Sequence, residues 1–110
     1  MLSHLHDLIK DKEILILGFG REGRSTLNRI LEVGDAAGIT IADGNEALTL
    51  PDAMEITTLS GDRKSVSTEG ISLLTGAHYM DSLEDYDVIF KSPGVVLPKA
   101  ADDYTCLITS

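Results

Sequence analysis

Residues 14–23 read Ile-Leu-Ile-Leu-Gly-Phe-Gly-Arg-Glu-Gly, an apolar run that ends in the pattern Gly18-x-Gly20-x-x-Gly23. The apolar run predicts a buried strand, and the glycines predict a tight turn that opens a helix. Such a turn leaves backbone N–H groups unpaired at the positive end of the helix, where they can hold a phosphate or diphosphate. The functional question is therefore whether this loop binds a nucleotide, and which one.

The segments on either side extend this start into alternating strands and helices. Apolar positions at helical spacing predict a helix that begins at Arg21 and ends at Gly34, and residues 39–42 predict a second strand. A strand–helix–strand unit of about 30 residues requires parallel strands with a right-handed crossover. A third strand is expected in 55–59 or in 71–74.

The rest of the chain is less regular, and residues 46–70 predict a short excursion or an exposed loop. The other elements expected are a leading helix in 3–10, a helical turn in 83–86, a strand in 87–91 and the start of another at 107–108. The predicted fold class is α/β, a Rossmann-like open three-layer sandwich with a mostly parallel sheet of about five strands. We expect residues 1–110 to form a single domain, a fragment of a longer protein.

Composition excludes several classes of protein. The 110 residues are 43% hydrophobic and 25% charged, as in an ordinary soluble domain. Because no apolar run reaches the roughly 18–20 residues that cross a bilayer and no signal peptide is recognisable, we expect a cytoplasmic protein. The net charge of −9 argues against binding to nucleic acid or to an anionic membrane, and it favours a monomer.

Residue types that carry catalysis or bind metal are sparse. The single cysteine, Cys106, excludes an internal disulfide and is interpreted as a buried or chain-end thiol. The three histidines lack acidic or cysteine partners at ligand spacing, so no metal site is expected. Neither a catalytic triad nor a Walker A sequence is present, and we expect no catalytic residue in this chain.

The candidate ligand contacts follow three predicted strands. They are the glycine loop Gly18–Gly23 with Arg21 and Glu22, the turn formed by Asp43, Gly44 and Asn45, and the turn that contains Ser92 and Gly94. In an open parallel sheet, ligands bind outside the carboxyl ends of the strands, near the point where the strand order reverses. Asp43 follows Gly23 by about 20 residues, the position from which an acid accepts hydrogen bonds from a ribose.

Each of these features also has a purely structural interpretation. The glycine turn can serve close packing alone in a flavodoxin-like domain, and residues 92–94 can form a plain turn. Arg21, Glu22 and Arg24 can be solvated surface side chains. Cations at a helix start oppose the helix dipole, a penalty that a bound diphosphate would reverse. Glu22 favours the dipole but would repel a phosphate if it pointed inward.

Three stretches resemble the N-terminal domain of the Mur ligases, and most closely the D-glutamate-adding members of that family. They are ILILGFGREGRSTLNRIL from residue 14, ITIADGNE from residue 39 and LEDYDVIFKSPGV from residue 83. Enzymes of this family join an amino acid to a UDP-muramoyl precursor in peptidoglycan synthesis. ATP phosphorylates the carboxylate of the precursor, and the amine of the amino acid, D-glutamate in these members, attacks the acyl phosphate.

The resemblance implies a division of labour between domains. This chain would anchor the UDP end of UDP-N-acetylmuramoyl-L-alanine, while ATP, Mg²⁺ and D-glutamate would bind to domains that lie outside it. The loop Gly18–Gly23 would cradle the diphosphate, Asp43–Asn45 would lie beside uracil and ribose, and Ser92 and Gly94 would close the other side. Gly44 and Asn45 stand where relatives often have threonine and arginine. The alternative function is an NAD-type dinucleotide-binding domain of a regulator or a dehydrogenase.

Overall fold

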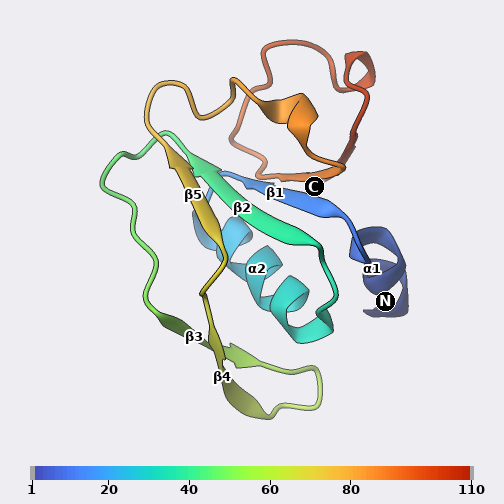
Figure 1. Cartoon of the computed structure of the whole chain (residues 1–110), viewed down its shortest axis with the longest axis vertical. Coiled ribbons are helices and arrows are strands. Elements are labelled where there is room, and N and C mark those ends of the chain that lie inside the picture. The colour runs from blue at the N-terminus through green and yellow to red at the C-terminus, as the bar shows by residue number, and fades with distance from the viewer. Residues whose placement is uncertain (1, 110) are drawn as a thin grey trace.

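A five-stranded parallel sheet forms the centre of the computed structural model, which describes residues 2–109 (Figure 1). Its order is β5-β2-β1-β6-β7, and every neighbouring pair is parallel. The strands are β1 (Glu13–Leu17), β2 (Gly38–Asp43), β5 (Ser72–Thr75), β6 (Val88–Lys91) and β7 (Leu107–Thr109). The predicted α/β, Rossmann-like architecture is confirmed, and the expected strands in 87–91 and at 107–108 are both present.

Strand β1 lies in the middle because its apolar run can be buried on both faces. Ile14 pairs with Ile39 of β2 on one side and with Val88 of β6 on the other. The four residues Ile14–Leu17 have no exposed surface. A strand covered on both faces has a continuous apolar run instead of an alternating one, and this explains why it was readable from the sequence.

Two helices cover one face of the sheet. Helix α1 (Leu2–Ile9) and helix α2 (Arg21–Val33) pack their apolar sides on the same buried cluster, to which β1, β2 and β6 all contribute. From α2 this cluster receives Leu27 and Ile30, which lie three residues apart and therefore share one side of the helix. The leading helix and the long helix are both confirmed at their predicted positions.

Irregular segments cover the other face. Leu15, Leu17 and Ile89 form a second buried cluster, and the partly buried side chains on it come mostly from residues 74–86 and 95–108. Outside the strands, these segments contain two short turns of 3₁₀ helix, Leu83–Asp85 and Ala101–Asp103, and are otherwise irregular. The third layer of the sandwich is therefore made of loops and single turns, and the turn expected in 83–86 is one of them.

Residues 46–70 contain a β-hairpin where a Rossmann-like fold has a crossover helix. Strands β3 (Ala53–Thr57) and β4 (Arg63–Ser67) pair antiparallel in a separate two-stranded sheet, which hangs below the main sheet beside α2 (Figure 1). Both predicted positions of the third strand hold a strand, but only β5 joins the main sheet. Within residues 2–109, no helix is long and apolar enough to span a membrane.

Candidate functional site

The glycine loop, residues 18–23, lies at the carboxyl end of β1, next to the ends of both neighbouring strands. Gly18 has a φ of +90°, and its N–H donates to the Ala42 carbonyl at the end of β2 (2.7 Å). A Cβ on Gly18 would come within 3.0 Å of the Ser92 and Val95 side chains beyond β6. A side chain is therefore excluded here both by the left-handed backbone and by lack of space.

The other two glycines of the pattern differ in how much space surrounds them. A Cβ on Gly23 would lie 2.2 Å from the Gly18 carbonyl oxygen, so the first turn of α2 rests directly on the loop. A Cβ on Gly20 would meet no atom within 4 Å. Gly23 thus serves close packing, whereas the backbone at Gly20 is open to the approach of a ligand.

Helix α2 begins without a capping side chain. Its first hydrogen bond runs from the Arg24 N–H to the Gly20 carbonyl (3.0 Å), and Gly20 has no side chain that could cap the preceding N–H groups. The N–H groups in the turn before Arg24 have no acceptor within the helix. They lie at the positive end of the helix dipole, which favours an anion there.

Asp43 joins the glycine loop to the end of β2. One carboxylate oxygen accepts the Phe19 N–H (2.8 Å), and the other accepts the Asn45 N–H (2.9 Å). The side chain of Asn45 in turn accepts the Ala47 N–H (3.0 Å). Asp43 therefore has a structural role at the predicted ribose position, although each oxygen keeps a second lone pair for a ligand.

The turn after β6 is fixed by two side chains. The Ser92 hydroxyl donates to the Gly18 carbonyl (3.2 Å), which links this turn to the glycine loop. The Lys91 ammonium donates to the carbonyls of Ser92 (3.0 Å) and Val95 (2.8 Å). Gly94 lies exposed within the turn, and no atom would lie within 4 Å of a Cβ there.

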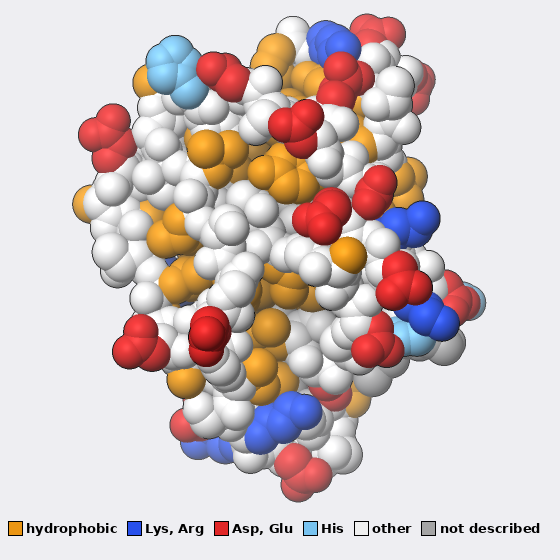
Figure 2. All heavy atoms as spheres, viewed as in Figure 1, with side chains coloured by type: hydrophobic (Ala, Val, Ile, Leu, Met, Phe, Trp, Pro, Cys, Tyr) orange, Lys and Arg blue, Asp and Glu red, His pale blue; other side chains and the backbone are white. Residues whose placement is uncertain are grey.

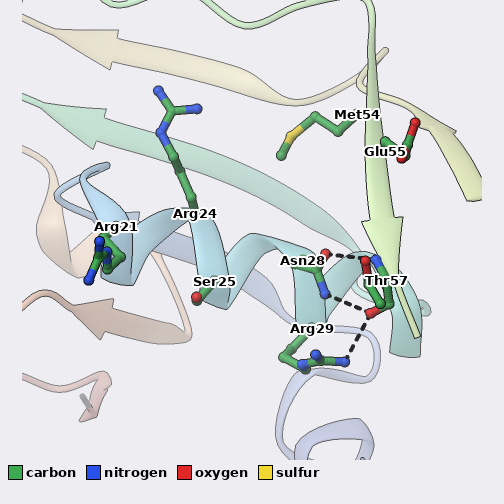
Figure 3. A pocket seen from close by; sticks show the side chains of 8 residues that line it. All are labelled: Arg21, Arg24, Ser25, Asn28, Arg29, Met54, Glu55 and Thr57. Atoms are coloured by element: carbon green, nitrogen blue, oxygen red, sulfur yellow. Dashed lines mark hydrogen bonds between the residues drawn. The ribbon is translucent and has the colours of Figure 1, made fainter. Parts of the chain in front are cut away.

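The acidic and basic side chains in the first turns of α2 line two different hollows. Glu22 lines a crevice of about 160 Å³ between α2 and the end of β6, together with Ser92 and Pro93. Arg21 and Arg24 line a groove of about 610 Å³ on the β3 side of the helix (Figure 3). Across the face shown in Figure 2, acidic side chains are spread widely and basic ones are isolated among them. The two arginines are thus a local exception in a chain of net charge −9.

Comparison with curated proteins gives these features a context. Over 86 residues the chain is 29% identical to the UDP-N-acetylmuramoylalanine–D-glutamate ligase of Ligilactobacillus salivarius. The aligned region covers 78% of this chain and 16% of that enzyme. Identity to the Enterococcus faecalis ligase of the same name is 31% over 87 residues, with the same coverage. The Clostridium novyi ligase is 28% identical over 100 residues, or 90% of this chain and 19% of the enzyme. The chain resembles UDP-N-acetylmuramoylalanine–D-glutamate ligases.

The resemblance predicted from the sequence is confirmed, and it concerns a small part of each ligase. The chain spans between 16% and 19% of the length of the ligases that it matches. No family model matches the chain. No solved structure matches it either.

The predicted site residues come together at one edge of the sheet. The glycine loop contacts the β2 end through the hydrogen bond of Phe19 to Asp43 and the β6 end through that of Ser92 to Gly18. Arg21 and Glu22 are exposed in the first turn of α2. Which of these residues bind a ligand stays a prediction.

Sequence reasoning missed several side chains that shape this edge. Tyr79 lies against Gly44, where a Cβ would come 3.4 Å from its ring, and Phe19 lies beneath the Arg24 guanidinium, 4.6 Å from the ring centroid. Lys91 holds the turn after β6. Lys91 could have been found, because a lysine directly before a Ser-Pro-Gly turn can reach the carbonyls of the turn. No local signal marks Tyr79, which lies 35 residues beyond Gly44.

Cys106 and two of the three histidines make contacts within the protein. The Cys106 thiol is half-buried and donates weakly to the Leu83 carbonyl (3.7 Å), and burial raises its pKa, which makes it a poor nucleophile. His6 pairs with Asp35 (2.8 Å) and His78 with Asp81 (2.9 Å). Among residues 2–109, no three His, Cys, Asp or Glu side chains gather as a metal site would require.

Proposed function

We propose that this chain is the substrate-anchoring domain of a D-glutamate-adding ligase and binds the UDP end of UDP-N-acetylmuramoyl-L-alanine. The observation that carries the proposal is the open backbone at Gly20, at an uncapped helix start, in a chain that resembles these ligases. The ligand would lie beside the carboxyl ends of β1 and β6, where the strand order reverses. Ligands of open parallel sheets bind at such a reversal.

The charge distribution supports one orientation of the ligand. The diphosphate would lie over the glycine loop on the side of Arg21, and away from Glu22. The uridine would continue toward Asp43–Asn45, while the muramoyl end would leave past Ser92 and Gly94. An anion in this place would relieve the repulsion between the arginines and the helix dipole.

Chemistry would take place outside this chain. In the proposed ligase, ATP and Mg²⁺ would bind to another domain and form the acyl phosphate there, and D-glutamate would attack it. The role of this chain would be to hold one end of the substrate, so that its reactive carboxylate reaches a site formed by other domains. We accordingly propose that the chain by itself is a cytoplasmic monomer without ligase activity.

Calorimetric titration of the 110-residue chain tests the proposal. We expect heat of binding with UDP and with UDP-N-acetylmuramoyl-L-alanine, and none with NAD. Gly20→Val is the matched variant, because its side chain would enter open space without disturbing the fold and would obstruct the approach of a phosphate. It should retain the melting temperature of the parent chain and lose binding.

Three results would contradict the proposal. Binding of NAD with no response to either UDP ligand would favour the dinucleotide-binding alternative. If a chain with the native circular dichroism spectrum gave no heat with any ligand, the glycine loop would serve close packing alone. Unimpaired UDP binding by Gly20→Val would place the nucleotide elsewhere on the molecule.

A further inference from the structure

A groove between α2 and β3, here named the arginine groove, lies beside the glycine loop (Figure 3). Its volume is about 610 Å³, within the roughly 300–1,000 Å³ typical of small-molecule sites. The crevice on the other side of α2, at about 160 Å³, is too small for a nucleoside. The residues that line the groove are Arg21, Arg24, Ser25, Asn28, Arg29, Met54, Glu55 and Thr57.

The far end of the groove is occupied by contacts within the protein. Asn28 and Thr57 are joined by two hydrogen bonds, one from the amide of Asn28 to the Thr57 carbonyl (3.3 Å) and one from the Thr57 N–H to the Asn28 side chain (3.2 Å). Arg29 pairs with Glu32. These polar groups hold β3 against α2 and are not available to a ligand.

The near end of the groove, beside the glycine loop, has polar groups that are available. The ion pairs found in residues 2–109 include neither Arg21 nor Arg24. Figure 3 shows the Arg24 side chain extending away from the helix, at the end of the groove opposite to Asn28 and Arg29. A ligand would find its cationic partners here.

Arg24 already makes a cation–π contact with an aromatic ring. Its guanidinium lies over the Phe19 ring, 4.6 Å from the ring centroid. Phe19 is 4% exposed, and its N–H is bound to Asp43, so the ring is a fixed support at the ends of β1 and β2. The guanidinium therefore has an aromatic neighbour at the sheet edge, while the residue as a whole is exposed and lines the groove.

The geometry points to Arg24 as the stacking platform for the uracil of the ligand, an inference that rests on the proposed function. A guanidinium stacks on planar rings, and nucleobases are commonly bound on arginine planes in this way. The thioether of Met54 lies on the β3 wall of the same groove and offers an apolar contact to a ring. With the diphosphate over the glycine loop and the ribose near Asp43, the base enters the near end of the groove.

In this role Arg24 needs its planar guanidinium as well as its positive charge. Lysine at this position keeps the positive charge but lacks the plane that stacks on a base. Arg24→Lys should therefore weaken UDP binding about tenfold, in line with the loss of one stacking contact. Arg63→Lys is the matched control, because Arg63 is exposed on β4 and pairs with Glu55 (3.0 Å), away from the glycine loop.

UDP titration followed by saturation-transfer NMR provides the test. In the parent chain we expect the uracil H5 and H6 protons to receive more saturation than the ribose H1′ proton. In Arg24→Lys the dissociation constant should rise about tenfold and the uracil share should fall. Arg63→Lys should match the parent in both measurements.

Two outcomes overturn the assignment of Arg24 and leave the proposed function intact. If Arg24→Lys binds UDP as tightly as the parent, the base does not stack on this residue. If binding weakens while the uracil share of saturation stays constant, Arg24 contacts the phosphates instead. Failure of the parent chain to bind UDP is a different result, because it overturns the proposed function, and this inference with it.

Discussion

The glycine loop and the β3–β4 hairpin both attach to α2, and they do so by different physical means. The loop contacts the helix through backbone atoms, with Gly23 directly against the Gly18 carbonyl. The hairpin is held by side chains: Ile56 of β3 is fully buried, two hydrogen bonds join Asn28 and Thr57, and the Leu59 N–H donates to the Glu32 carboxylate (2.9 Å). A substitution at the backbone contact is therefore expected to be costly, because the new side chain has no space. A substitution that removes one exposed hydrogen bond is expected to cost only about 1 kcal/mol.

The largest effect is expected from Gly23→Ala. Its new Cβ would lie 2.2 Å from a backbone oxygen, which cannot move without shifting β1 or α2. We expect the free energy of unfolding in urea to fall by about 3 kcal/mol or more. Gly20→Ala is the control in the same loop and should change it by about 0.5 kcal/mol or less, because nothing lies near that Cβ. Equal losses for the two variants would contradict the packing role assigned to Gly23.

Asp43→Asn should have the next largest effect. The amide can still accept one of the two N–H groups now bound by Asp43, but its NH₂ would face the other, from Phe19 or Asn45. Loss of a charge-assisted hydrogen bond is expected to cost about 2 kcal/mol in urea unfolding. Asp7→Asn, on the exposed side of α1, should be close to neutral. Faster hydrogen exchange confined to Phe19 and Asn45 would locate the loss, and unchanged exchange at both amides would argue against it.

Asn28→Ala tests the attachment of the hairpin. Both hydrogen bonds to Thr57 disappear, and we expect a loss of about 1–2 kcal/mol. The amide of Thr57 should exchange faster, while the amides of β1 keep their protection, since the hairpin forms a sheet of its own. Ser25→Ala, in the same groove, serves as the control. Loss of protection throughout the main sheet would show that the hairpin supports the core and is not an appendage.

Gly38→Ala should have the smallest effect. A Cβ there would lie 2.4 Å from a Glu13 carboxylate oxygen, nearly as close as the contact at Gly23. The neighbour in this case is the end of a flexible, exposed side chain that can turn away, so we expect a change of about 0.5 kcal/mol or less in the free energy of unfolding. A loss comparable to that of Gly23→Ala would show that short distance alone, and not the stiffness of the neighbour, governs these sites.

The same contrast explains what could be predicted. The strand 14–17, the glycine loop and α2 were predictable because their signals are local, an apolar run followed by glycines and then by apolar residues at helical spacing. Strand β4 reads Arg-Lys-Ser-Val-Ser and has one partly buried side chain, Val66. It is a strand because it pairs with β3, and this pairing is invisible to any local pattern.

The candidate site divides in a similar way. The three strand ends could be placed at one edge because parallel strands linked by right-handed crossovers bring their carboxyl ends together. The same reasoning could not foresee that Asp43 binds the Phe19 N–H, or that Tyr79 lies against Gly44. Those contacts depend on where loops from distant parts of the chain come to rest. Whether a UDP-linked ligand occupies the edge stays a prediction.

The sequence by itself determined the central strand, the glycine loop and the helix that follows, because burial and backbone conformation are dictated there by consecutive residues. It also determined the resemblance to the ligases, which depends on the same stretch, on β2 with the turn that follows it, and on residues 83–95. Only the tertiary structure decided that a hairpin stands beside α2, that Glu22 and the two arginines face different hollows, and that Arg24 rests on Phe19. These features arise from packing between segments far apart in the chain, and such packing has no local signature.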